Sequence, residues 1–214
     1  MTTVIFVRHG QSESNLNRIF TGQNNTLLTE LGHEQAKRTA LFLKDYPISQ
    51  IYASDLTRAM QTAAPTAELH GLTVQPNPRL REIFAGDWEG LSYEALKETY
   101  KESYNRWITD IGRAAPENGE RVSELYARVT EEVARLVEKH HGETIAIFSH
   151  ATPSRAMGCF WYGVAPEEMA SVKWVTNASV SIAEYHDNGE IRVVLYSYDE
   201  HQGDATTALP KGSA

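Results

Sequence analysis

Three short apolar runs, each followed at once by polar residues, constrain the fold of this chain more than any other feature. They cover residues 2–7, 50–54 and 143–148, and a helical pattern follows the second and the third. Runs of this length are typical of buried strands, and strands that alternate with helices are typical of a mostly parallel sheet. The sequence therefore predicts an α/β fold.

Two amphipathic segments, residues 28–46 and 122–141, predict helices that cover the sheet. Thr29 can cap the first helix, and Gly142 is a stop signal after the second. Near the end of the chain, apolar segments flank the turn sequence Asp187-Asn188-Gly189, which predicts a β-hairpin. We therefore expect the sheet to finish with an antiparallel edge strand.

The chain is long enough for one well-packed core, with 214 residues of which 41% are apolar and 22% are charged. We expect a single domain over residues 1–202 and a flexible tail over residues 203–214, where the sequence shows no periodicity. Residues 79–119 carry scattered aromatic side chains and no strand signal. We interpret this stretch as an insertion of short helices and loops over the strand ends, where it would shape a pocket.

Charge and cysteine content exclude several kinds of partner and site. The formal net charge of -8 opposes binding to nucleic acids and to acidic membrane surfaces. Cys159 is the single cysteine, so an internal disulfide and a Cys-rich zinc site are excluded, and the histidines lack metal-ligand spacing. The apolar run at residues 4–7 is too short for a signal-peptide core or a membrane span. We expect a cytoplasmic protein without a bound metal.

The ends of the predicted strands bring together two arginines and two histidines. Arg8 and His9 follow the first strand, Arg58 lies one turn into the helix after the second, and His150 follows the third. The carboxyl ends of parallel strands meet at one edge of a sheet, so these side chains should converge. Arginine pairs with phosphoryl oxygens and imidazole can act as a nucleophile, so this set suits a phosphoryl group and its transfer.

Ordered motifs along nearly the whole chain resemble those of a known family. They are RHG at residues 8–10, Asn15, RIFTG ending at Gly22, LTELGHEQA, SDLTRAMQTA, LREIFAGDWEG and FSHATPSR. The set resembles the histidine phosphatase superfamily, also called the phosphoglycerate mutase-like family. This resemblance implies a three-layer α/β/α sandwich. The REIFAGDWEG segment resembles the phosphatase branch of the family rather than the ERHYG pattern of the mutases.

The resemblance also implies roles for individual residues. His9 would attack phosphorus and become a phosphohistidine, and Glu82 would protonate the leaving alkoxide and then activate water. The residues that would hold the phosphoryl group or the substrate are Arg8, Asn15, Thr21, Gly22, Arg58, His150 and Ala151. Gln11 and Ala151 depart from the family pattern, which commonly has an acid and a glycine at these positions, and residues 25–29 depart from Asp-x-Pro-Leu-Thr.

Structural alternatives stay open for some of these residues. Arg58 could form a helix-surface ion pair with Asp55. Glu82, Asp87 and Glu89 lie close together in the sequence, and each could be a solvated charge.

The function that we expect is a phosphatase that acts on small phosphomonoesters without a cofactor. A cofactor-dependent phosphoglycerate mutase, which would return the phosphoryl group to the bound glycerate through the same phosphohistidine, is an alternative. A catalytically silent phosphate-binding module is a further alternative, although every charged core residue is present. The expected partner is a small phosphorylated metabolite, and a sheet edge formed by the last strand could support a homodimer.

Overall fold

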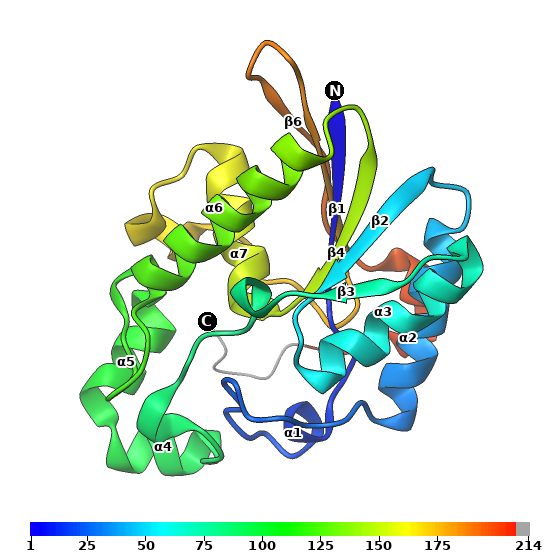
Figure 1. Cartoon of the computed structure of the whole chain (residues 1–214). Coiled ribbons are helices and arrows are strands. Elements are labelled where there is room, and N and C mark those ends of the chain that lie inside the picture. Colours follow the sequence, from blue (N-terminus) through cyan, green and yellow to red (C-terminus); the bar gives the residue numbers. More distant parts are fainter. Residues whose placement is uncertain (209–214) are drawn as a thin grey trace.

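A computed structural model of the chain describes residues 1–208 and places six strands in one mixed sheet. The strands are β1 (Thr2–Arg8), β2 (Ile48–Ala53), β3 (Val74–Pro76), β4 (Thr144–Ser149), β5 (Val180–Tyr185) and β6 (Ile191–Tyr198). Their order across the sheet is β3-β2-β4-β1-β5-β6 (Figure 1). The pairs β3–β2, β2–β4 and β4–β1 are parallel, whereas β5 is antiparallel to both β1 and β6. The predicted mostly parallel sheet with an antiparallel edge is confirmed.

Two apolar cores lie on opposite faces of the sheet. Val4 and Phe6 of β1 belong to one core, and Ile5 and Val7 belong to the other, because side chains alternate along a strand. The helices that cover the faces are α2 (Glu30–Leu43), α3 (Thr57–His70), α6 (Val122–Lys139) and α7 (Ala151–Tyr162). Side chains of α6 and α7 pack in the first core and those of α2 and α3 in the second. The predicted three-layer sandwich is therefore confirmed.

The predicted capping residue Thr29 and the predicted stop residue Gly142 lie at the ends of two helices. The Oγ1 of Thr29 accepts a hydrogen bond from the backbone N–H of Gly32 at the start of α2. Gly142, with φ of +85°, follows the end of α6. Strand β3 is not predicted, because its three residues are too few to show a periodic pattern. Within residues 1–208, no helix combines the length and the apolar character that crossing a membrane requires.

Between β3 and α6 the chain forms short helices, as expected for the aromatic insertion. Figure 1 shows α4 (Tyr93–Thr99) and α5 (Lys101–Thr109) beyond the carboxyl ends of the parallel strands. The fully buried Trp88 lies at the centre of this region, with its ring 5.3 Å from Phe20 and 6.0 Å from Trp107 between centroids. The other short helices are α1 (Glu13–Leu16), η1 (Pro78–Leu80), η2 (Gly86–Trp88), η3 (Ile111–Arg113), η4 (Pro166–Ser171) and η5 (Glu200–Ala205).

Residues 203–208, which are predicted from the sequence to be part of a flexible tail, make defined contacts. The carbonyl of Ala205, a buried residue, accepts a hydrogen bond of 2.7 Å from Gln35 Nε2 on α2. Thr207 donates a hydrogen bond of 3.0 Å to the Oδ1 of Asn177. The segment is attached by polar contacts, which hydrophobic periodicity does not reveal. The rest of the predicted tail, residues 209–214, lies outside the described residues.

Candidate active site

The predicted site residues line one cavity beyond the carboxyl ends of β1 and β4, with the exception of His150. Those that line it are Arg8, His9, Asn15, Thr21, Gly22, Arg58, Glu82 and Ala151. Arg8 ends β1, and the backbone N–H of His9 continues the pairing by donating to the carbonyl of Ser149. Gly10 follows because a Cβ there would lie 2.6 Å from the carbonyl oxygen of Gly32 in α2.

The ring of His9 has a defined orientation and tautomer. Its Nδ1 lies 2.7 Å from the carbonyl oxygen of Gly10, which can only accept a hydrogen bond, so Nδ1 carries the proton. Burial lowers the pKa of His9 well below its usual range, and the positive charges of Arg58 and Arg8 lower it further. The imidazole is therefore neutral at pH 7, and its Nε2 has a free lone pair.

His150 is fully buried and caps the start of α7. Its Nε2 lies 2.7 Å from the Oγ of Ser54, which also accepts a hydrogen bond from the N–H of Leu56. The Ser54 hydroxyl can donate its proton to Nε2, and in this tautomer the proton of His150 is on Nδ1. This Nδ1 has no hydrogen-bond partner among the described residues. Burial lowers the pKa of His150 well below its usual range, followed in size by the effects of Arg58 and His9.

Two buried guanidinium groups supply the positive charge of the site. Arg58 donates to the carbonyls of Asn24 and Gly22, at 2.9 and 2.8 Å. Arg8 donates to the carbonyl of Val175 at 2.6 Å. Burial lowers the pKa of Arg58 to about 10, so it stays charged at pH 7.

The structure decides against the helix-surface ion pair between Arg58 and Asp55. Asp55 instead pairs with Arg81 through two hydrogen bonds of 2.5 and 2.6 Å. Arg58 is only 1% exposed, and its guanidinium is left to the loop carbonyls and to the cavity that it lines.

The carboxyl group of Glu82 lies against the start of α7. Its Oε2 accepts from the backbone N–H groups of Ala151 and Thr152, at 3.1 and 3.4 Å, and its Oε1 accepts from the N–H of Ile83 at 2.9 Å. The backbone N–H of Ala151, expected to contact substrate, is thus used by Glu82.

The two neighbouring acids have structural roles. Glu89 Oε1 accepts from the N–H groups of Gln23 and Ala85, at 2.7 and 3.1 Å. Asp87 accepts a hydrogen bond from Asn118 at 2.9 Å. Neither acid lines the cavity. Glu82 is therefore the carboxyl group that the segment presents to the site.

The loop residues of the predicted site differ in what they can offer. The Oδ1 of Asn15 accepts hydrogen bonds from the backbone N–H of Ser12 and from Asn177 Nδ2. These two contacts use the oxygen and leave the N–H groups of the Asn15 amide available as donors. The hydroxyl of Thr21 donates to the carbonyl of Ile19 at 3.4 Å, a long contact. Gly22 has φ of +53°, and a Cβ there would lie 2.3 Å from Glu89 Oε1.

Several residues that line the cavity are absent from the sequence-based set. Asn177 is the most central, because its Nδ2 also donates to the carbonyl of His9 at 3.2 Å. It lies in the irregular segment before β5, and no pattern in the sequence marks it. By contrast, the aromatic residues of the insertion that line the cavity are indicated by the sequence, which shows scattered aromatic side chains over residues 79–119. The further lining residues are Gln11, Ile19, Phe20, Ile83, Tyr93, Tyr104, Trp107, Thr152, Trp174, Thr207 and Ala208.

Comparisons with known proteins agree with this arrangement. The sequence model of the histidine phosphatase superfamily (branch 1) matches residues 4–198. Phosphoserine phosphatase 1 of Hydrogenobacter thermophilus is 32% identical over 195 residues, which cover 91% of this chain and 92% of the relative.

Solved structures share the fold over the same extent. Bacillus stearothermophilus YhfR aligns with a TM-score of 0.89 and 27% identity, covering 94% of this chain and 99% of that one. Mycobacterial glucosyl-3-phosphoglycerate phosphatase Rv2419c, in complex with VO3, aligns with a TM-score of 0.85 and 27% identity, covering 92% and 99%. Because the family model matches nearly the whole chain, this protein belongs to the histidine phosphatase superfamily, branch 1.

Proposed function

We propose that this protein hydrolyses small phosphomonoesters through a phosphohistidine at His9. The observation that carries the proposal is the neutral His9, with its proton fixed on Nδ1 and its Nε2 free, in a cavity that two buried arginines also line. A neutral imidazole nitrogen can attack phosphorus, whereas a protonated one cannot. The names of the two related phosphatases, which act on phosphoserine and on glucosyl-3-phosphoglycerate, support the same class of reaction.

The reaction takes two steps. In the first, His9 Nε2 forms a bond to phosphorus while the P–O bond to the leaving group breaks, and Glu82 gives its proton to the departing oxygen. In the second, Glu82 takes a proton from water, the water oxygen bonds to phosphorus and the P–N bond breaks. The products are the alcohol and inorganic phosphate, and His9 and Glu82 return to their starting protonation states.

The charge that builds up on the phosphoryl oxygens needs fixed donors. Arg8 and Arg58 line the cavity and remain protonated, so they would stabilise this charge. The Nδ1–H of His150 has no protein partner among residues 1–208, and a phosphoryl oxygen would supply one. Asn15 would add a neutral donor through its amide N–H groups.

Hydrolysis is favoured over the mutase reaction by the lining of the cavity. A mutase must retain the glycerate between two phosphoryl transfers, which calls for a cation to hold its carboxylate. Among the described residues that line the cavity, the arginines and lysines are Arg8 and Arg58, and both are needed for the phosphoryl group. The remaining wall is aromatic, apolar or neutral polar apart from Glu82 and His9.

The test is phosphorus NMR of the protein with 3-phosphoglycerate and a trace of 2,3-bisphosphoglycerate, together with a panel of phosphomonoesters. We expect inorganic phosphate to accumulate without the 2-phosphoglycerate isomer. His9→Ala is the control: it removes the nucleophile, so turnover should be lost, and circular dichroism verifies that the variant is folded. Rapid appearance of the isomer would instead establish a mutase, and turnover by His9→Ala would exclude His9 as the nucleophile. Binding of phosphate without turnover would indicate a non-catalytic module.

We further propose that the enzyme works in the cytoplasm, without a metal and without contact to nucleic acids. The net charge of -8 supports the last point, because it repels a polyanion. A homodimer through the sheet edge at β6 stays a prediction, which sedimentation velocity would test.

A further inference from the structure

Glu82 lies on a segment that has no regular structure of its own. Residues 81–85 belong to no helix or strand and connect η1 to η2. The hydrogen bonds of the Glu82 carboxylate to α7 are long, at 3.1 and 3.4 Å. The main chain therefore needs other partners, both to satisfy its polar groups and to hold the carboxyl group at a defined place.

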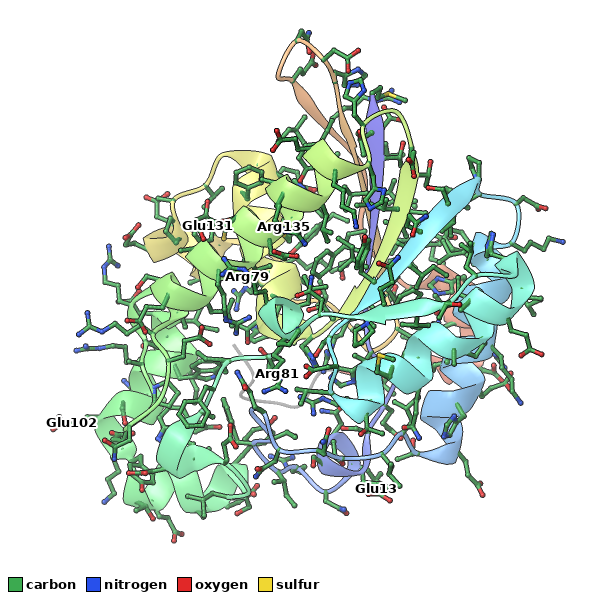
Figure 2. All side chains as sticks on the ribbon, in the orientation of Figure 1. Glu13, Arg79, Arg81, Glu102, Glu131 and Arg135 are labelled. Carbon is green, nitrogen blue, oxygen red and sulfur yellow. The ribbon has the colours of Figure 1, made fainter. Side chains whose placement is uncertain are left out.

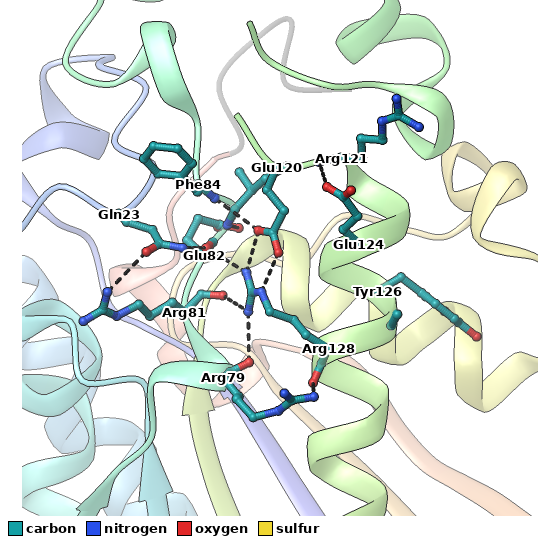
Figure 3. A network of polar contacts seen from close by, with 12 residues as sticks. Gln23, Arg79, Arg81, Glu82, Phe84, Glu120, Arg121, Glu124, Tyr126 and Arg128 are labelled. Atoms are coloured by element: carbon teal, nitrogen blue, oxygen red, sulfur yellow. Dashed lines mark hydrogen bonds and ion pairs between the residues drawn. The ribbon is translucent and has the colours of Figure 1, made fainter. Parts of the chain in front are cut away.

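Arg128 of α6 supplies two of these partners, at the carbonyls of Arg81 and Glu82 (Figure 3). Its Nη1 donates to the carbonyls of Arg79 and Arg81, at 2.9 and 2.8 Å, and its Nη2 donates to the carbonyl of Glu82 itself at 3.0 Å. The Glu82 carbonyl also accepts from Gln23 Nε2 at 3.1 Å. One guanidinium group thus binds two carbonyls of the segment that presents Glu82 to the cavity, and one carbonyl of η1, which precedes it.

Glu120 completes the arrangement from the other side. Its carboxylate accepts the two remaining donors of Arg128, from Nε at 2.6 Å and from Nη2 at 2.8 Å. It also accepts from the N–H of Phe84 at 3.2 Å, and its own N–H donates to the Phe84 carbonyl at 2.7 Å. The two charged side chains are only 18% and 14% exposed, so solvent does not readily replace these contacts.

The helix that carries Arg128 is a rigid support. Leu125 and Val129, on either side of it in the chain, are fully buried in the core between α6 and the sheet. All five N–H groups of the planar Arg128 guanidinium donate hydrogen bonds. The three N–H groups of a lysine cannot reproduce this forked geometry. Arg128 therefore couples the Glu82 main chain to α6, in addition to the attachment that the buried neighbour Ile83 provides.

We propose that Arg128, oriented by Glu120, is a positioning residue that sets the distance between the Glu82 carboxyl group and the leaving-group oxygen. The proposal rests on the proposed phosphatase function and adds to it a residue outside the cavity. Arg128 does not line the cavity, so it should act on the reaction through the Glu82 main chain that its fork binds. Loss of the fork would let the carboxyl group drift, and a shift of about 1 Å can cost roughly 100-fold in rate.

The test uses Arg128→Lys, which keeps the charge and removes the fork. Arg135→Lys is the matched control, because Arg135 also lies on α6, about one turn beyond Glu131 (Figure 2). Arg135 is 57% exposed and donates both of its hydrogen bonds to Glu132, away from the carbonyls of Arg79, Arg81 and Glu82. For each variant, kcat/KM is measured with an alkyl phosphate, which needs protonation of its leaving group, and with p-nitrophenyl phosphate, which needs little.

We expect Arg128→Lys to lower kcat/KM for the alkyl ester about tenfold or more beyond any loss for the aryl ester. This ratio does not depend on the folded fraction, so partial unfolding cannot imitate it. Arg135→Lys should leave both values within about twofold of the wild type. In a Glu82→Gln background, Arg128→Lys should produce no additional loss with the alkyl ester, because both changes act on the same proton transfer.

Three outcomes would overturn the proposal. Equal losses for both esters would mean that Arg128 only stabilises the fold, and no loss with either ester would mean that the fork is dispensable. Full additivity with Glu82→Gln would show that Arg128 acts elsewhere. A wild-type protein that hydrolyses neither ester would be a different failure, since it would remove the proposed function itself.

Discussion

His9 and His150 have buried rings with centroids 5.1 Å apart, and two arginines lower the pKa of each further than burial alone does. The same charges have opposite uses in the two states of the site. Without substrate they add to the effect of burial, which lowers the pKa of both imidazoles, and with substrate they would neutralise the phosphoryl oxygens. The requirement for neutral histidines therefore links the chemistry of these residues to the stability of the fold.

This link predicts a loss of stability at acidic pH. The unfolded chain takes up protons on both imidazoles as the pH falls below about 6.5, whereas the folded protein does not until a much lower pH. The free energy of unfolding should therefore decrease below about pH 6.5, by up to roughly 1.4 kcal/mol per pH unit for each histidine. Urea unfolding at about pH 7.5 and about pH 5.5 measures the effect. An equally steep decrease in His150→Asn would contradict the assignment of this loss to His150.

Glu82→Gln tests the acid directly. The amide cannot donate a proton to the leaving oxygen, so we expect kcat/KM for alkyl phosphates to fall by about 100-fold or more. Aryl phosphates, whose leaving groups are stable anions, should be affected far less. Steady-state kinetics across a series of esters would show this as a steeper dependence on the leaving-group pKa. The same loss across the whole series would mean that Glu82 is not the acid.

At the scale of elements, the loop that contains Gly22 joins the insertion to the cationic part of the site. The Gly22 carbonyl accepts from Arg58, and its Cα faces the carboxylate of Glu89, which binds the N–H groups of Gln23 and Ala85. A glycine is required here for two separate reasons, the positive φ and the lack of space for a Cβ.

Gly22→Ala should therefore be more destabilising than the same change at another glycine with positive φ. Gly71 has φ of +63° and no atom within 4 Å of the place that an alanine methyl group would take, so Gly71→Ala measures the backbone cost alone, about 1 kcal/mol. At Gly22 the clash with Glu89 adds to that cost, and the total should reach about 2–3 kcal/mol. Urea unfolding of both variants gives the difference, and equal values would show that the loop adapts to the methyl group.

The elements also show how far the sequence could lead. β1, β2, β4 and the helices capped by Thr29 and stopped by Gly142 have strong local signals, and the structure places them as predicted. β3 and the attachment of residues 203–208 depend on a three-residue pairing and on isolated hydrogen bonds, which leave no periodic pattern. The roles of Asn177 and Arg128 depend on which backbone groups lie beside them in the folded protein. These groups belong to residues far away in the sequence, so no local sequence pattern reveals the contacts.

At the scale of the whole molecule, the site lies where the parallel strands end and the aromatic insertion folds over them. Among the residues described, Arg8 and Arg58 are the arginine and lysine side chains that line the cavity. Within residues 1–208, no group of three or more His, Cys, Asp and Glu side chains is arranged to hold a metal ion.

As proposed above, we expect catalysis to be independent of metals. Activity toward p-nitrophenyl phosphate should be the same before and after prolonged treatment with EDTA, because Arg8 and Arg58 perform the charge neutralisation that a metal performs in other phosphatases. A metal-dependent phosphatase treated in parallel verifies that the chelation is effective. Loss of activity that a divalent cation restores would disprove this expectation.

The placement of Thr207 and Ala208 in the cavity wall has a practical consequence for handling the protein. An affinity tag or a fluorescent fusion at the carboxyl terminus would follow a segment whose residues Thr207 and Ala208 line the cavity. Met1 lies at the opposite end of the strands, where its amino group pairs with Asp187 in the hairpin turn (Figure 1). Fusions and surface immobilisation should therefore be made through the amino terminus, so that a sensor or a flow reactor built from this enzyme keeps an open cavity.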